Sequence, residues 1–275
     1  MTAGGCGIKR APFLHAQGPV SHIELDLLLR TSAIMLVVIV PVILMAFWFA
    51  WRYRASNGKG RYTPNWTYSG RLDAVVWTIP ALIVIALAVH LWIYSHRLDP
   101  YKRLDPAAQT LEVHVVAQDW KWLFLYPKQG IATVNDLAFP SGAPLSLKIT
   151  SDTVMNSFSI PALGGQIYAM AGMRTELNLM ADKPGHYSGR NTQYSGRGFA
   201  NQHFTATAMT PQDFEAWLAK VRQSPDALDK AAYARLAQPG VPKEVIHYAS
   251  YQAGLFEAII AKYRGGSARA AAAGR

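Results

Sequence analysis

Cysteine is almost absent from this chain of 275 residues, which contains only Cys6. One thiol excludes an internal disulfide, and it excludes any metal site that needs two thiolate ligands. An exported domain must then be stabilised by its hydrophobic core alone. The small residues at positions 3–5 precede Cys6, as in a bacterial lipoprotein signal, but five upstream residues are too few for its hydrophobic part. Cys6 is therefore either a lipidation site in a longer precursor or an ordinary thiol.

Acidic residues are also scarce, with 17 Asp and Glu against 27 Lys and Arg, so the formal net charge is +10. A basic excess can mark nucleic-acid binding. The sequence has neither an aromatic-basic RNA motif nor a zinc-finger spacing, however, and one basic loop and a basic tail account for the excess. We therefore expect no nucleic-acid partner.

Charged residues are missing altogether from two apolar stretches, residues 31–51 and 74–94. Each stretch has 21 residues without Asp, Glu, Lys or Arg. A helix of that length reaches roughly 30 Å, the thickness of the hydrocarbon core of a bilayer. Pro41 and Pro80 do not argue against spanning, because membrane helices tolerate proline. The sequence therefore predicts a transmembrane helical hairpin over residues 31–94.

The loop between these stretches predicts their orientation. Five basic residues precede its first acidic residue, Asp73: Arg52, Arg54, Lys59, Arg61 and Arg71. Basic loops of this kind stay on the cytoplasmic side. We therefore expect a two-pass protein of a bacterial inner membrane, with both termini and everything after residue 95 on the periplasmic side.

The rest of the chain divides by composition and periodicity. Apolar and polar residues alternate between Gly, Pro and Asn clusters from Thr110 onward, which is typical of an antiparallel β-sandwich. A helical extension is expected after Thr210, a candidate N-cap followed by Pro211. The predicted divisions are an external N-terminal segment (1–30), the hairpin (31–94), a connector (95–109), the sandwich domain (110–209), the helical extension (210–264) and a disordered tail (265–275).

One stretch of the predicted sandwich has the spacing of a copper site. Asn191, Ser195, Phe199 and Gln202 fall on the frame Cys-x3-Cys-x3-His-x2-Met, which holds the two-copper centre of cytochrome c oxidase subunit II. None of these four side chains is the soft ligand that such copper needs. The sequence keeps the spacing of the site without its ligands.

Four sequence motifs carry a resemblance to a known family that covers nearly the whole chain, from about residue 20 to residue 264. They are RYRASN after the first apolar stretch, VVWTIP in the second, QDWKWLFLYPKQGIATVN in the sandwich and VMNSFSIPALGGQIYAMAGM before the copper-like frame. The chain resembles subunit II of the haem-copper respiratory oxidases, and within them the cytochrome bo-type ubiquinol oxidase branch. The resemblance implies a membrane protein in which a two-helix transmembrane hairpin is followed by a cupredoxin-like antiparallel β-sandwich and a C-terminal helical extension.

The resemblance also identifies the remaining copper positions. Asn156 stands where the copper-bearing branch has a histidine, and Gln193 where a glutamate supplies a backbone carbonyl. All five side-chain ligands are thus replaced, and we expect neither a metal nor a redox cofactor in this chain. His114, His186 and His203 leave open a type-2 copper or zinc site, although each is isolated in the pattern and a surface or strand-end histidine is the simpler interpretation.

A subunit without copper cannot take electrons from cytochrome c, so the expected donor is a quinol in the membrane. The resemblance implies that subunit I holds the quinol site, both haems and the remaining copper, and that the smaller subunits III and IV are further partners. This chain would be a structural subunit of a proton-pumping ubiquinol oxidase. A menaquinol oxidase subunit is one alternative, and a membrane-anchored binding protein without catalytic partners is another.

We expect several aromatic, histidine and methionine side chains to have packing roles. Trp120 and Trp122 are expected to pack against subunit I, and His90 is expected to face that partner from within the second apolar stretch. Met170 and Met173 are expected in an interface or a core, because methionine fills irregular contacts well.

Asp73 is the one residue of this chain that could take part in the reaction. It precedes Trp77 by four residues, where the resembled quinol oxidases have a glutamate at the mouth of a proton channel into subunit I. A carboxylate at the membrane face is suited to collecting protons. The alternative is a favourable charge at a helix N-terminus, which requires no function.

Overall fold

The computed structural model describes residues 12–58, 64–105 and 107–273, with side chains as far as residue 264. Cys6, Lys59 and Arg61 lie outside the described residues, and so does the predicted lipidation site. One compact unit spans Leu25–Asp99, and the remaining described residues form a second unit.

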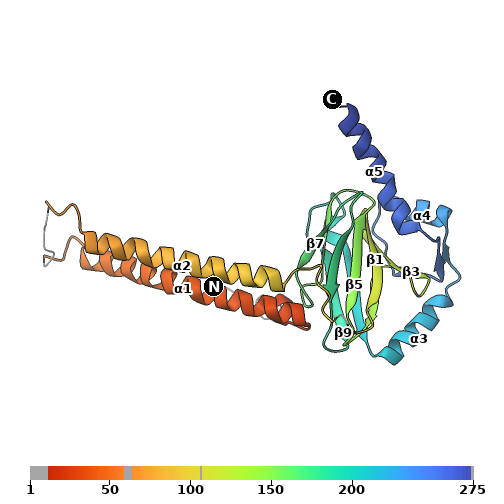
Figure 1. The fold of residues 1–275 in the computed structure, drawn as a ribbon, viewed down its shortest axis with the longest axis horizontal. Coiled ribbons are helices and arrows are strands. Elements are labelled where there is room, and N and C mark those ends of the chain that lie inside the picture. The colour runs from red at the N-terminus through yellow and green to blue at the C-terminus, as the bar shows by residue number, and fades with distance from the viewer. Residues whose placement is uncertain (1–11, 59–63, 106, 274–275) are drawn as a thin grey trace. The chain divides into compact units, whose positions relative to one another are not determined.

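The first unit is the predicted helical hairpin. Helices α1 (Pro19–Arg52) and α2 (Gly70–Arg97) run side by side (Figure 1), and both are long and apolar enough to cross a membrane. Both helices begin before the uncharged stretches and end after them, because many flanking residues are still good helix formers. The Tyr94 hydroxyl donates a 2.7 Å hydrogen bond to Oδ2 of Asp26, whose Oδ1 accepts from Nε of Arg30 at 2.7 Å. This contact links the two helices.

The second unit contains a sandwich of two sheets (Figure 1). Sheet A has the order β12-β3-β2-β1-β5-β8, and sheet B has the order β4-β10-β9-β6-β7. The strands are β1 (Leu111–Gln118), β2 (Lys121–Tyr126), β3 (Ile131–Val134), β4 (Asp136–Pro140), β5 (Leu145–Ser151), β6 (Asn156–Ser159), β7 (Gln166–Ala169), β8 (Thr175–Leu179), β9 (Gly185–Asn191), β10 (His203–Met209) and β12 (Ile246–Tyr248).

The sandwich departs from the predicted antiparallel arrangement in two places. β1 pairs in parallel with β5, and β10 pairs in parallel with β4. Parallel neighbours need a crossover connection in place of a hairpin, and here the chain leaves sheet A after β3, adds β4 to sheet B and returns as β5. The alternation of residues predicts that strands are present, but it does not predict the direction of their partners.

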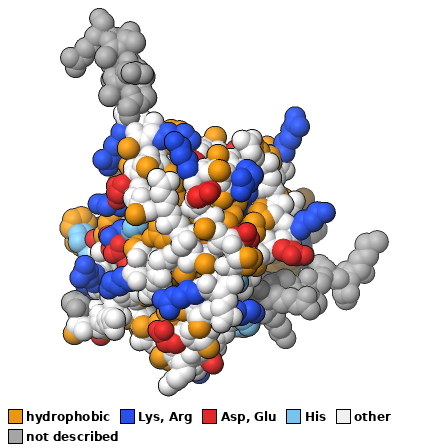
Figure 2. Space-filling view, turned by 90° about the vertical axis from the view of Figure 1, so that its right-hand side faces the viewer, with side chains coloured by type: hydrophobic (Ala, Val, Ile, Leu, Met, Phe, Trp, Pro, Cys, Tyr) orange, Lys and Arg blue, Asp and Glu red, His pale blue; other side chains and the backbone are white. Residues whose placement is uncertain are grey.

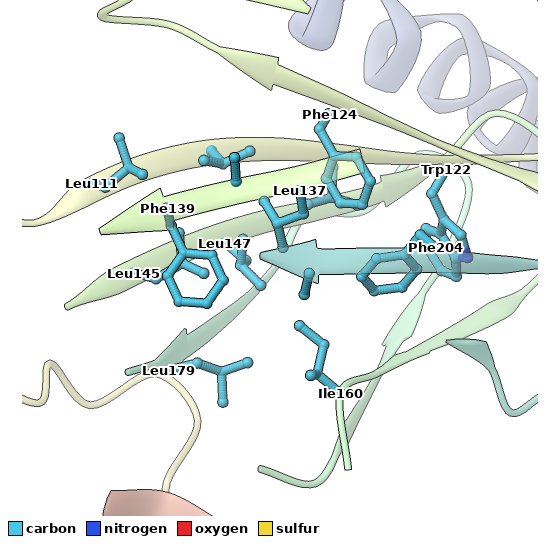
Figure 3. Close-up of a cluster of buried hydrophobic side chains, with 14 of the residues drawn as sticks. Leu111, Trp122, Phe124, Leu137, Phe139, Leu145, Leu147, Ile160, Leu179 and Phe204 are labelled. Carbon is cyan, nitrogen blue, oxygen red and sulfur yellow. The ribbon is translucent and has the colours of Figure 1, made fainter. Parts of the chain in front are cut away.

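The main core lies between the two sheets and consists of large apolar side chains (Figure 3). Trp122 and Phe124 of β2 meet Phe158 of β6 and Phe204 of β10, with ring centroids 4.9 to 6.4 Å apart. Trp122 is fully buried in this cluster. The prediction that it packs against a partner subunit is therefore wrong, because the pleat of β2 turns its side chain into the domain's own core.

The segment before α1 belongs to the same unit as the sandwich. Its described part, residues 12–18, includes a short 3-10 turn, η2 (Pro12–Leu14). The backbone N–H of Gln17 donates to the carbonyl of Ala162 at 2.8 Å, and the N–H of Asp182 donates to the carbonyl of Gln17 at 2.9 Å. The imidazole of His22 also lies 3.0 Å from Oδ2 of Asp182. The predicted external N-terminal segment thus contacts the sandwich directly.

The extension, here residues 210–273, begins where the sequence predicts. Helix α3 (Pro211–Arg222) starts with Thr210 as its N-cap, whose hydroxyl oxygen accepts from the N–H of Asp213. The remaining elements are β11 (Ala227–Leu228), α4 (Lys230–Leu236), β12, β13 (Ser250–Tyr251) and α5 (Leu255–Ala273). The extension is therefore not purely helical, since β12 adds a strand to the edge of sheet A and β11 pairs with β13.

The extension covers the outer face of sheet A and creates a second core there. Leu123 and Leu125 of β2 are fully buried under Phe256, Ile259 and other apolar residues of the extension. Helix α5 continues to Ala273, through residues that the sequence predicts to be disordered. This segment is rich in alanine, the residue type with the highest helix propensity, which favours continuation of the helix.

Charges are mixed on the face of the molecule in Figure 2. Among the described residues visible there, Lys and Arg side chains are interspersed with Asp, Glu and hydrophobic side chains. The basic excess of the sequence is therefore not gathered into a single patch on this face.

Candidate functional site

Four of the six copper-site positions meet inside the sandwich. Asn156 at the start of β6, Asn191 at the end of β9, and Ser195 and Gln202 in the following loop are all buried, with exposed fractions from 0 to 8 %. Nδ2 of Asn191 lies 2.7 Å from Oδ1 of Asn156, 3.0 Å from Oγ of Ser195 and 2.9 Å from Oε1 of Gln202. Oγ of Ser195 donates to Oε1 of Gln202 at 2.9 Å. We call these four residues the amide network.

Backbone groups satisfy the other ends of the amide network. Oδ1 of Asn191 accepts from the N–H groups of Ser157 at 2.8 Å and Gln193 at 3.0 Å. Nδ2 of Asn156 donates to the carbonyl of Val154 at 2.8 Å. A buried amide is costly without partners, and these contacts remove that cost. The network holds together two segments that are distant in sequence, the start of β6 and the loop between β9 and β10.

The other two positions lie outside the network. Phe199 belongs to a short 3-10 turn, η3 (Phe199–Asn201), and its ring packs on Tyr194 with centroids 5.7 Å apart. Gln193 contributes its backbone N–H to Asn191. The structure therefore brings together four of the six predicted positions and leaves Phe199 as a packing residue.

Trp120 closes this loop from the side of sheet A. Its indole N–H donates to the carbonyl of Ser195 at 3.0 Å. A Cβ added at Gly198 would lie 2.2 Å from the ring of Trp120, so only glycine permits this approach. Trp120 has a left-handed backbone with φ of 66°, which is uncommon for a bulky residue. The loop contact thus accompanies local strain at Trp120.

The donor set of the amide network does not fit a mixed-valence copper pair. Amide and hydroxyl oxygens are harder ligands than the thiolates and imidazoles that such copper requires. The three histidines of the alternative metal site are also not brought together. His114 of sheet A lies 2.8 Å from Glu112, His186 of sheet B lies 3.1 Å from the hydroxyl of Thr207, and His203 lies 2.7 Å from the carbonyl of Ala200. Among the described residues, no three His, Cys, Asp or Glu side chains form a metal-binding group.

His114 belongs instead to a charged cluster under α5. Its ring lies 4.3 Å from that of Phe256, and Nζ of Lys148 lies 2.8 Å from Oε2 of Glu112. Burial lowers the pKa of His114, and the neighbouring Glu112 only partly opposes this shift. Burial acts to raise the pKa of Glu112, but its contacts with Lys148 and His114 outweigh that effect and leave the pKa lowered.

The remaining candidates belong to other elements. Asp73 is exposed in the first turn of α2, and the ring of His90 packs on Tyr94 of the same helix with centroids 4.6 Å apart. Met173 is half exposed, whereas Met170 is partly buried.

Two residues that the sequence analysis did not single out join the extension to the sandwich. The side chain of Asp152 is 2 % exposed and accepts from the Tyr233 hydroxyl at 2.6 Å and from Nζ of Lys262 at 2.8 Å. Nζ of Lys121 donates to the carbonyls of Leu236 at 2.9 Å and Gln238 at 2.7 Å. The partners of these charges lie about a hundred residues away along the chain, so no local pattern could have revealed them.

Two family models match the chain. The model for the periplasmic domain of cytochrome c oxidase subunit II matches residues 82–206, and a model for the COX aromatic-rich motif matches residues 222–267. The second match covers most of the extension. Among solved structures, the periplasmic domain of cytochrome oxidase subunit II from Bradyrhizobium japonicum is similar, with a TM-score of 0.40, 21 % identity, and coverage of 42 % of this chain and 94 % of that chain.

Curated relatives match almost the full chain. Cytochrome bo(3) ubiquinol oxidase subunit 2 of Pseudomonas putida is 48 % identical over 92 % of this chain and 80 % of its own length. Ubiquinol oxidase subunit 2 of Acetobacter aceti is 47 % identical over 92 % of this chain and 83 % of its own length. Quinol oxidase subunit 2 of Bacillus cereus is 34 % identical over 90 % of this chain and 86 % of its own length. The chain therefore belongs to the subunit 2 family of the ubiquinol and quinol oxidases.

Proposed function

We propose that this chain is the non-redox subunit 2 of a proton-pumping ubiquinol oxidase, which couples ubiquinol oxidation to the reduction of oxygen to water. The observation that carries this proposal is the amide network, because hydrogen bonds between Asn156, Asn191, Ser195 and Gln202 occupy the place of the copper ligands. A subunit built in this way has no relay for electrons from cytochrome c. The haems, the copper and the quinol site then belong to subunit I, with subunits III and IV as further partners.

The preference for ubiquinol follows from the relatives. Those named for ubiquinol are 39 to 48 % identical to this chain over at least 82 % of its length, whereas the quinol oxidase subunit of Bacillus cereus is 34 % identical. A menaquinol oxidase is therefore the second candidate. In both cases we expect the hairpin to span the bacterial inner membrane, with both termini and the sandwich on the periplasmic side, because basic loops such as the one after α1 stay on the cytoplasmic side.

Purification of the chain from its native membrane tests this proposal. We expect a large haem-bearing subunit to co-purify, and we expect the complex to consume oxygen with ubiquinol and not with reduced cytochrome c. Turnover with menaquinol alone would favour the second candidate. A lone colourless protein, or oxidation of cytochrome c through copper bound in the sandwich, would contradict the proposal.

We propose in addition that Asp73 admits protons to the complex from the cytoplasmic side. Asp73→Asn removes the titratable group, so we expect oxygen reduction and proton uptake to fall severalfold in the purified complex. Asp73→Glu restores the residue type of the resembled oxidases and should retain both rates. Asp105→Asn, at an exposed position in the predicted connector, serves as a matched control. Unchanged rates in Asp73→Asn would leave this residue with only a helix-terminal role.

A further inference from the structure

Helices α4 and α5 of the extension contact loops next to the amide network. Oδ2 of Asp152, in the loop between β5 and β6, accepts from the hydroxyl of Tyr233 in α4, and Oδ1 accepts from Lys262 in α5. The hydroxyl of Tyr263 also donates to the backbone carbonyl of Asp152 at 2.7 Å. Three side chains from two helices of the extension therefore converge on one residue of this loop.

A second loop of the sandwich receives the same helix. A Cβ added at Gly172 would lie 3.2 Å from Cβ of Tyr263, so the backbone of this loop approaches α5 closely. Gly172 has a φ of 75°, a conformation that glycine adopts without strain. The hydroxyl of Thr150 donates to the carbonyl of Met173 at 2.6 Å and links this second loop to the end of β5.

Short contacts connect Asp152 to the amide network. Two residues after Asp152, the carbonyl of Val154 accepts from Oγ of Ser151 at 2.7 Å and from Nδ2 of Asn156 at 2.8 Å. Asn156 in turn accepts from Asn191 at the centre of the network. The hydroxyl of Thr153 also bonds to the carboxylate of Asp119, which precedes Trp120. The short backbone segment from Asp152 to Val154 thus joins the hydrogen bonds of the extension to those of the former copper loop.

The negative charge of Asp152 strengthens its hydrogen bonds with Tyr233 and Lys262. A buried carboxylate is costly unless it is paired, and hydrogen bonds to ionised groups exceed neutral ones in strength. Burial and the neighbouring carboxylate raise the pKa of Tyr233, so the phenol keeps its proton and remains a donor. The hydrogen bond from Lys262 to Asp152 likewise raises the pKa of that lysine and keeps it charged.

We propose that the extension orders the loops of the former copper site through Asp152, and that it thereby supplies the rigidity that metal ligands supply in a copper-bearing domain. The amide network joins Asn156 to the loop of residues 191–202, and Nε2 of Gln202 donates to the carbonyl of Gln118 at 3.4 Å, but the network contains no residue of the extension. Asp152 adds a tether to helices that are packed on the opposite face of sheet A. Loop order in this chain then depends on residues that lie about 80 to 110 positions away in sequence.

Hydrogen exchange of the full chain within its purified complex tests this proposal. The decisive variants are Tyr233→Phe and Lys262→Met, because they leave the sequence of the two measured loops, residues 153–157 and 191–195, unchanged. We expect amide exchange in residues 153–157 and 191–195 to accelerate roughly fivefold or more in each variant, since local opening sets the exchange rate. Lys262 is 59 % exposed, so its replacement preserves the packed core.

A matched control separates this tether from docking of the extension in general. Glu257 of α5 lies 3.5 Å from Arg174 of the sandwich in an exposed ion pair, and Glu257→Gln should leave exchange in both loops unchanged. Faster exchange confined to α4 and α5 in the Tyr233→Phe and Lys262→Met variants would overturn the proposal. Equal acceleration in Glu257→Gln would also overturn it, since the effect would then not pass through Asp152.

Discussion

Single residues decide what the sandwich can do chemically. Asn191 is the centre of the amide network, because its side chain contacts Asn156, Ser195 and Gln202 and accepts from two backbone N–H groups. Nδ2 has only two hydrogens for these three oxygens, so the contacts are shared. A ring of amides can satisfy itself in this way without a metal, whereas a ring of thiolates would repel itself unless a cation were bound.

Replacement of Asn191 by leucine should therefore destabilise the sandwich. The change keeps the size of the side chain but leaves the N–H of Ser157 and the carbonyl oxygen of Asn156 buried without their partner, and Oε1 of Gln202 keeps only the hydroxyl of Ser195. We expect a loss of about 2–4 kcal/mol in the free energy of unfolding, measured by denaturant unfolding of the chain in detergent. Thr192→Val, at the exposed neighbouring position, should change this value little. An equal loss in both variants would argue against a special role for the network.

The lowered pKa of His114 predicts how the free energy of unfolding depends on pH. Because burial lowers its pKa in the folded state, the unfolded chain binds the proton more readily. Stability should then fall as the pH decreases through the ordinary histidine pKa of 6.5 toward the lowered value, by at most about 1.4 kcal/mol per pH unit for one proton. His114→Phe should flatten this slope, whereas His186→Phe at an exposed site should not. Thermal unfolding between pH 7.5 and about 5 measures the difference.

At the scale of elements, the extension is the part that the sequence describes least well. Its first helix is predicted by Thr210, Pro211 and the apolar spacing, and these local signals are confirmed. The strand β12 has no such signal, because its three residues become a strand only by pairing with β3 at the edge of sheet A. Short strands are decided by the partner that they meet and not by their own composition.

Lys121 should determine how firmly α4 is held. Its buried ammonium group donates to two carbonyls at the C-terminal end of that helix, where cations are favourable. Lys121→Met keeps the apolar stem and removes both donors, so we expect a local loss of about 1–3 kcal/mol. Limited proteolysis or hydrogen exchange over residues 227–248 measures this loss. Lys230→Met, at the exposed start of α4, should have no comparable effect, and equal loosening in both variants would contradict the role of Lys121.

For the whole molecule, the extension is a structural requirement of the sandwich. The outer face of sheet A presents five buried apolar residues to the extension: Val116, Leu123, Leu125, Ala132 and Val134. A soluble antiparallel sheet usually exposes polar residues on its outer face. Here both faces of β2 are apolar, and all six of its residues are buried.

Truncation after Met209 should therefore produce an aggregating protein. It exposes the apolar outer face of sheet A and the edge of β3, and exposed apolar patches and strand edges promote association. Truncation after Arg264 retains the residues of the second core and should leave the protein soluble in detergent as a single species. Size-exclusion chromatography distinguishes the two results. A monodisperse chain that ends at Met209 would contradict the idea that the sandwich requires the extension.

Much of this protein is predictable from local pattern. The two helices long enough to cross a membrane follow from uncharged stretches, and the strands follow from alternation. The expected replacement of the copper ligands is a prediction from five residue identities and the family resemblance. Each of these features depends on neighbours in sequence or on the type of a single side chain. The inward position of Trp122 was missed because alternation cannot say which face of a strand is covered when both faces are apolar.

Contacts between distant segments could be seen only in the folded chain. The parallel pairing of β1 with β5, the burial of Lys121 and the meeting of Asp152 with Tyr233 and Lys262 all join residues that are far apart in sequence. Such contacts depend on how two sheets and an extension pack, and packing is a property of the whole chain. The sequence therefore predicts that the copper ligands are replaced, and the fold shows which contacts hold these loops in place.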